Sequence, residues 1–128
     1  MANRNFDFIQ ALGKGIKVIS GSFAPNGSSA VASTSVKGKG FSVARTSAGL
    51  FTITLQDAYV ALLAADASLQ LATADDKFVQ IGAVDVVSAK TVQIRVWDIS
   101  DAAVADVAAN AGNRIHFTLV LSNSTLNA

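Results

Sequence analysis

The fold is decided by the stretch "RTSAGLFTITLQDAY", Arg45–Tyr59, in which apolar and polar side chains alternate strictly from Phe51 to Gln56. Alternation at every second residue is typical of a β-strand that buries one face. The preceding "FSVAR", Phe41–Arg45, alternates too, and Gly49 in the intervening "TSAG" can adopt a positive φ angle at little cost. We therefore predict a β-hairpin, which makes this stretch scaffold rather than an active site. Its predicted buried face carries Phe51, Ile53 and Leu55.

The same alternation recurs along the chain, in segments that turn-forming residues separate. "FAPNGSS" holds the only proline, with Asn26-Gly27 directly behind it, and "KGKG" and "TADDK" are further breaks. Gly82 interrupts one alternating run, which predicts a β-bulge or a close backbone contact. Further strands are predicted at Gly15–Phe23, Ser68–Ala72, Lys77–Val87, Thr91–Trp97 and Arg114–Leu121.

These strands, without a long helical period, predict a single all-β domain over residues 1–128. Its architecture is an antiparallel β-sandwich or a jelly-roll-like barrel with long loops. The segments 57–67 and 98–113 are rich in alanine, and Asp57 could cap a short helix. We favour strand and loop in both, with an extra hairpin in the second. Residues 1–14 form a candidate N-terminal arm.

Composition narrows the class of function. Of the residues, 51% are hydrophobic and only 15% are charged, below the usual charged share of about 25%. This favours burial against a partner, although a domain coated with Ser and Thr would have the same composition. The formal net charge of +1 leaves no excess of positive charge for nucleic acid. The N-terminal stretch lacks a signal-peptide pattern, and no segment approaches a transmembrane length, so we expect synthesis in the cytosol and no membrane partner.

The residue types that carry chemistry do not assemble into a catalytic or metal site. The chain has no cysteine, and His116 is the only histidine, so we expect His116 to lie on a strand surface or at an interface. All nine acidic residues are aspartates, which favour turns, and Asp75-Asp76 matches no calcium loop. The Gly-Lys-Gly stretches lack the P-loop pattern. We therefore expect no enzyme activity, no cofactor and no metal.

One pair of side chains favours a partner interface. Arg95 and Trp97 share a strand face with Gln93, and aromatic residues and arginine are enriched at protein–protein interfaces. A second, covered core layer would explain the same pattern. Phe6 and Phe8 in the candidate arm are expected to pack on a neighbour or on the domain itself. The predicted interface residues are Phe6, Phe8, Arg95, Trp97 and His116.

Four stretches give the chain a family resemblance, and together they span most of Phe23–Ser124. They are "FAPNGSS", "VKGKGFSVARTSAGLFTITLQDAYVAL", "VQIRVWD" and "NRIHFTLVLSNS". In these the chain resembles small structural proteins of tailed bacteriophage particles. The resemblance implies a β-sandwich or jelly roll that serves as a capsid decoration, or cement, protein. Such proteins bind outside the capsid lattice and clamp neighbouring capsid subunits.

From the resemblance we expect a virion structural protein, assembled in the host cytoplasm, that binds the major capsid protein as a homo-oligomer. Two alternatives stay open. The first is a tail or fibre component, which would differ in symmetry. The second is a carbohydrate- or receptor-binding sandwich, in which Trp97 and Tyr59 would be stacking platforms.

Overall fold

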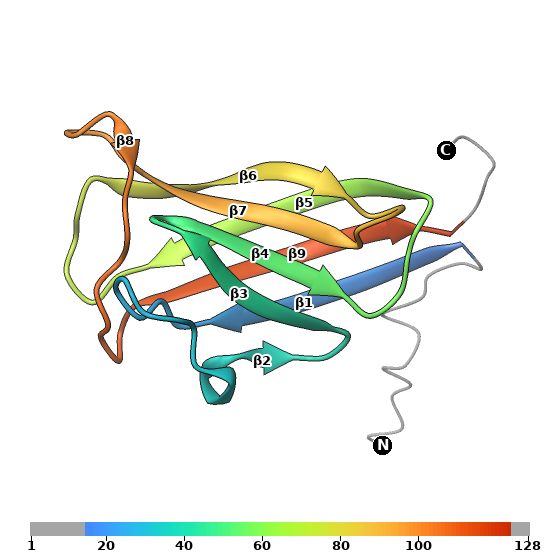
Figure 1. The fold of residues 1–128 in the computed structure, drawn as a ribbon, viewed down its shortest axis with the longest axis horizontal. Helices are drawn as coiled ribbons and strands as arrows, with labels where there is room; N and C mark the ends of the chain where they lie inside the picture. The colour runs from blue at the N-terminus through green and yellow to red at the C-terminus, as the bar shows by residue number, and fades with distance from the viewer. Residues whose placement is uncertain (1–14, 124–128) are drawn as a thin grey trace, which may run out of the picture.

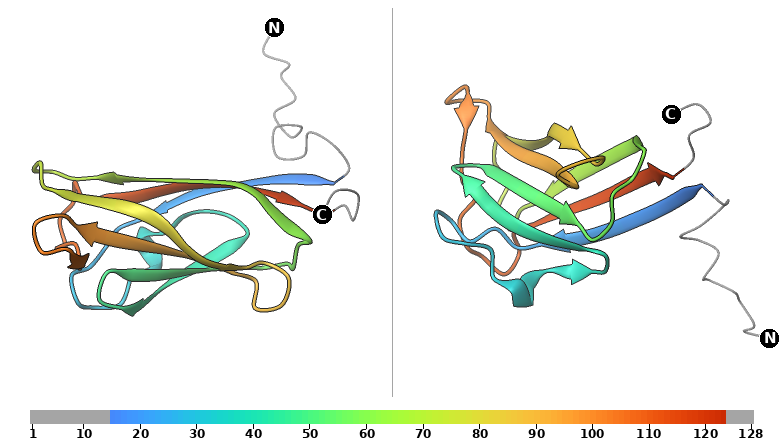
Figure 2. Two further views of the ribbon diagram at one scale, coloured as in Figure 1. Left: turned by 90° about the horizontal axis from the view of Figure 1, so that it is seen from above. Right: turned by 45° about the vertical axis from the view of Figure 1, so that its right-hand side comes forward.

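The computed structural model describes residues 15–123 and consists of two antiparallel β-sheets packed face to face (Figures 1 and 2). The view from above in Figure 2 shows the two layers directly. Sheet A has the order β2 (Lys37–Gly38), β1 (Ile16–Phe23), β9 (Arg114–Ser122), β5 (Ala61–Gln70). Sheet B has the order β3 (Phe41–Ser47), β4 (Leu50–Leu55), β7 (Thr91–Asp98), β6 (Lys77–Asp85), and the short β8 (Ala103–Val104) also pairs with β7. A 3₁₀ turn, η2, covers Ser33–Ser35.

The predicted all-β antiparallel sandwich is confirmed, and its two sheets do not close into a barrel. The described residues contain no α-helix, so strand and loop prevail in both alanine-rich segments. Within the first, β5 pairs with β9 from Ala61↔Ser122 to Gln70↔Arg114, and this pairing overrides the helix preference of alanine. The strand expected at Ser68–Ala72 is therefore wrong in its bounds. Lys37–Gly38, expected as a break, instead pairs with β1.

The predicted hairpin is present with the expected faces. Strands β3 and β4 pair from Phe41↔Leu55 to Ser47↔Leu50, and Gly49 in the turn has a φ angle of 65°. Glycine is required there for a second reason: a Cβ atom on Gly49 would lie 2.6 Å from the backbone nitrogen of Ala105. The turn therefore packs against the loop that follows β8. Arg45 reinforces this contact, because Nε and Nη2 donate to the Asp106 carboxylate at 3.0 and 2.8 Å.

The core lies between the sheets and is built from the alternating residues of β1, β4, β7 and β9. Phe23 and Phe51 approach from opposite sheets with ring centroids 5.1 Å apart, and the ring of Phe41 meets that of Phe117 at 4.9 Å. Gly21 makes room for this contact, since a Cβ atom there would lie 2.2 Å from Phe41 Cζ. The fully buried large side chains are Phe23, Phe51, Ile19, Ile53, Leu55, Ile94, Ile115, Leu119, Leu121, Val92 and Val96.

The two ends of the described chain lie side by side at one end of sheet A. The backbone N–H of Asn123 donates to the carbonyl oxygen of Gly15 at 2.7 Å, and β1 begins opposite the end of β9. Phe6 and Phe8, two of the predicted interface residues, fall outside the described residues. Within residues 15–123 no helix is long and apolar enough to cross a membrane.

Candidate binding surfaces

The outer face of sheet B carries a row of large apolar side chains. Phe78 on β6 lies directly opposite Trp97 on β7, and Trp97 lies directly opposite Val104 on β8. Residues that pair directly across strands point to the same side of a sheet, so these three side chains form a continuous row. Phe78 is 38% exposed and Val104 is 42% exposed, although both are apolar. We call Phe78, Trp97 and Val104 the apolar row.

A network of charged side chains holds the register of the apolar row. The next cross-strand pair is Lys77↔Asp98, and Lys77 Nζ lies 2.6 Å from Asp75 Oδ2 and 3.6 Å from Asp98 Oδ2. Asp98 Oδ1 also accepts the hydroxyl of Ser100 at 2.8 Å, while Asp76 Oδ2 accepts the backbone N–H of Ser100 at 2.9 Å. The turns that precede β6 and follow β7 are thus tied together at this end of the sheet.

These interactions explain the aspartates of the "TADDK" turn. The hydrogen bond from Lys77 is the main reason that the pKa of Asp75 falls to about 2, from an ordinary 3.8. The pKa of Asp98 is lowered chiefly by the hydroxyl of Ser100. Each carboxylate is already used by a neighbouring donor, and residues 15–123 contain no group of three or more His, Cys, Asp or Glu placed to hold a metal ion.

Arg95 lies beside the apolar row, in the middle of the same face. In register it faces Leu50 on β4 and Gln80 on β6. The predicted irregularity at Gly82 is present, because the β6–β7 register shifts between Ile81 and Val84. A Cβ atom on Gly82 would lie 3.3 Å from Arg95 Nη2, so the guanidinium rests over this bulge. Arg95 Nε is buried and has no hydrogen-bond partner within residues 15–123.

A shallow hollow of about 270 Å³ borders Arg95 on the other side of β7, between the β3–β4 turn and β8. Strands β4 and β8 lie along the same edge of β7, and the hollow forms at the gap between them. The first residue of β4, Leu50, pairs with Arg95, and the last residue of β8, Val104, pairs with Trp97. Its lining residues are Ser47, Ala48, Leu50, Gln93, Arg95 and Val104.

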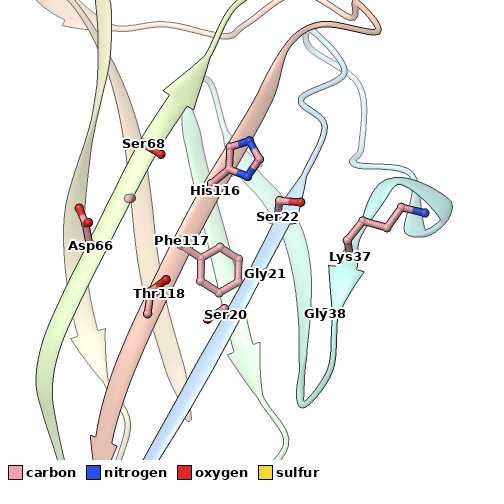
Figure 3. Close-up of a pocket in the computed structure, with 11 residues that line it drawn as sticks. Ser20, Gly21, Ser22, Lys37, Gly38, Asp66, Ser68, His116, Phe117 and Thr118 are labelled. Atoms are coloured by element: carbon pink, nitrogen blue, oxygen red, sulfur yellow. The ribbon is translucent and has the colours of Figure 1, made fainter. Parts of the chain in front are cut away.

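The outer face of sheet A is mixed: near one end Val18 lies opposite Val120, and both are half-buried. Around His116 the outward side chains are mostly polar. Figure 3 shows them side by side on β5, β9 and β1. His116 is exposed there, with Nε2 2.8 Å from Gln70 Oε1, so its side-chain partner among the described residues is an amide rather than an orienting carboxylate. The face forms an open hollow of about 410 Å³, lined by Ser20, Gly21, Ser22, Lys37, Gly38, Asp66, Ala67, Ser68, His116, Phe117 and Thr118.

The structure brings only part of the predicted interface together. Arg95 and Trp97 share the outer face of sheet B, as predicted, but His116 lies on the outer face of sheet A and points to the opposite side of the sandwich. Phe78 and Val104 were missed. The only sequence signal for Phe78 was its alternation with Val79, because pairing across strands cannot be read from one sequence.

Tyr59, expected as a stacking platform in the carbohydrate-binding alternative, is only 4% exposed. It lies in the β4–β5 connection, where its N–H donates to the carbonyl oxygen of Val86 at 2.9 Å, and its side chain joins the core. Tyr59 is therefore a core residue.

Comparison with known proteins adds no assignment. No protein-family model matches the chain, and neither the protein sequences nor the solved structures compared with it gave a significant match.

Proposed function

We propose that this chain is a structural protein of a tailed-bacteriophage particle, a capsid decoration protein that stabilises the shell by bridging neighbouring copies of the major capsid protein. The observation that supports this most is the apolar row beside Arg95 on the outer face of sheet B. Large aromatic side chains and arginine dominate the energetics of protein interfaces. The resemblance of the sequence to phage structural proteins points to the same class.

The position of the row suits a bracing role. Trp97 lies on β7, which pairs with β6 along its whole length and with β4 and β8 on the other side. A side chain on such a strand is held by its neighbours before the partner binds, which reduces the entropy lost on association. A standard interface buries about 1,600 Å², and modest contacts repeated over a shell give high avidity.

The proposal has no catalytic step, cofactor, nucleic acid or membrane. It places the protein in the virion, as a homo-oligomer assembled in the host cytoplasm. A tail or fibre component would use the same surface with a different symmetry, so imaging of the native particle distinguishes the two. The carbohydrate-binding alternative is weakened, because Tyr59 is buried and Trp97 remains the single platform of the expected pair.

The test compares particles assembled with and without this protein. We expect particles that carry it to retain their DNA at higher temperature and after osmotic shock. The double variant Phe78→Ser/Trp97→Ser should fold but fail to bind the particle, whereas Thr118→Ala, on the outer face of sheet A, should bind like the wild type. Equal survival of particles with and without the protein would refute the proposal.

A further inference from the structure

Arg95 differs from the other two arginines of residues 15–123 in having no acceptor. Arg45 binds the carboxylate of Asp106 with two hydrogen bonds. Arg114 donates Nε to the hydroxyl of Ser22 at 2.8 Å and Nη2 to the carbonyl oxygen of Ser35. Arg95 Nε is buried without a partner among these residues. The positive charge of Arg95 is therefore not neutralised by any described residue, and its side chain borders the open hollow between the β3–β4 turn and β8.

The surroundings of Arg95 explain how the side chain is kept available. Its direct cross-strand neighbours, Leu50 and Gln80, carry no charge. The bulge places Gly82 beneath the guanidinium, and a larger residue there would meet Nη2 or Nε. The guanidinium therefore lies on the sheet surface next to the apolar row, without an intramolecular carboxylate that would compete for it.

We infer that Arg95 binds a carboxylate of the partner polypeptide, an Asp or Glu adjacent to an apolar side chain that packs on the apolar row. Because Nε is buried, the carboxylate approaches the guanidinium end-on and accepts from its two terminal nitrogens, Nη1 and Nη2. The inference rests on the proposed function, since the polypeptide concerned is the capsid subunit.

The spacing of the two features fits one extended segment of the partner. Arg95 and Trp97 are alternate residues on one strand face, which places them about 6.6 Å apart along β7. In an extended partner segment, side chains two residues apart point to the same face and span the same distance. The acid would orient the segment, and the apolar side chain would supply most of the buried area.

Binding to particles that lack the protein tests the inference directly. Arg95→Met keeps the length and apolar stem of the side chain but removes its charge and donors. We expect it to weaken binding about tenfold or more, with unchanged thermal stability and a smaller dependence of affinity on salt. Lys39→Met, which removes one positive charge from the exposed β2–β3 turn, is the matched control and should bind like the wild type. If Arg95→Met binds like Lys39→Met, the inference is wrong while the proposed function stands.

A measurement on the isolated protein separates the inference from the proposed function. The Nε–H resonance of Arg95 can be followed by NMR during titration with sodium acetate, with sodium chloride at equal ionic strength as the control. We expect acetate to shift Arg95 and leave the already paired Arg45 and Arg114 nearly unchanged. 4-Methylpentanoate, which adds an apolar group, should saturate at lower concentration. Identical responses to acetate and chloride would overturn the inference, whatever the particle experiment gives.

A second copy of this chain is the competing occupant. Sedimentation of the wild type, Arg95→Met and Trp97→Ser detects it. If the wild type is a dimer, Trp97→Ser is a monomer and Arg95→Met is still a dimer, the outer face of sheet B binds a second copy without a carboxylate on Arg95. That result would contradict the inference. We expect all three proteins to have the same mass at equal concentration.

Discussion

The outer faces of sheets A and B carry different side chains. On sheet A, serines, Thr118 and His116 surround an open hollow, as Figure 3 shows, and the outward Val18 and Val120 are half-buried. Sheet B presents the apolar row and an arginine without an acceptor. The inner faces of both sheets are apolar because the shared core requires it. The core places no such requirement on the outer faces, so the exposed Phe78 and Val104 of sheet B, on either side of the half-buried Trp97, need a separate reason, and an interface supplies one.

The largest expected effect comes from breaking the core that both faces share. Phe51 is fully buried and packs on Phe23 of the other sheet. Phe51→Ala should lower the free energy of unfolding by about 3–5 kcal/mol, from lost burial and the cavity left behind. Urea unfolding followed by tryptophan fluorescence measures this. Leu63→Ala, at a side chain that is 50% exposed, is the control and should change stability by less than about 0.5 kcal/mol. Equal effects of the two substitutions would contradict the described packing.

The next largest effect is expected at Gly49, in the β3–β4 turn of sheet B, with Gly27 as the comparison. Gly49 and Gly27 both have positive φ angles, 65° and 59°. A Cβ atom on Gly49 would collide with Ala105, whereas one on Gly27 would meet nothing within 4 Å. Gly27→Ala should therefore cost only the left-handed conformation, roughly 1–2 kcal/mol. Gly49→Ala adds the collision, and its loss in chemical denaturation should be clearly larger. Similar losses for both variants would mean that the turn does not pack on the loop after β8.

A smaller effect is expected at the ion pair that anchors the same loop. The two hydrogen bonds from Arg45, and then the N–H of Gly49, hold the pKa of Asp106 below its ordinary 3.8. A lowered carboxyl pKa contributes stability above the unfolded pKa and loses it as the pH falls through the folded pKa. Asp106→Asn should therefore melt at a lower temperature than the wild type near neutral pH. The decrease in melting temperature should be smaller than that of Gly49→Ala, because the Arg45–Asp106 pair is partly solvated.

The same pair gives a pH test. The difference in melting temperature between wild type and Asp106→Asn should be constant well above the ordinary carboxyl pKa of 3.8 and shrink as the pH falls through the lowered pKa of Asp106. Asp75 and Asp98 titrate in the same acidic range, but they are present in both proteins and cancel in the difference. A difference that persists unchanged at the lowest pH would show that the Asp106 carboxylate is not the origin of the effect.

Most of the fold was predictable because its central strands alternate strictly. In β7 and β9 every second residue is fully or nearly fully buried, so the pattern alone locates these strands. Strand β5 was not fully predictable, because "ALLAADASLQ" lacks a strict alternation and is kept extended by its pairing with β9. Tyr59 was misplaced because the sequence does not show that the β4–β5 connection turns inward to Val86.

The candidate site was predictable only within one strand. Arg95 and Trp97 share a face because they are two residues apart on β7. Phe78 and Val104 join them through strand register, which depends on the bulge at Gly82 and on the short β8. His116 was grouped with them on residue type alone. The sequence does not show that its strand, β9, belongs to the other sheet, so it could not show that His116 faces the opposite side of the sandwich.

The smallest expected effect sharpens the contrast between the two faces. His116 is exposed and its side chain bonds only to Gln70 among the described residues, so His116→Ala should change the free energy of unfolding by less than about 0.5 kcal/mol. Particle binding should also be unchanged, because the side chain lies on the face that the proposed partner does not use. A binding loss comparable to that of Phe78→Ser/Trp97→Ser would mean that both faces contact the capsid. The sandwich would then be held between two subunits rather than seated on one face, and the hollow of sheet A would become the second contact.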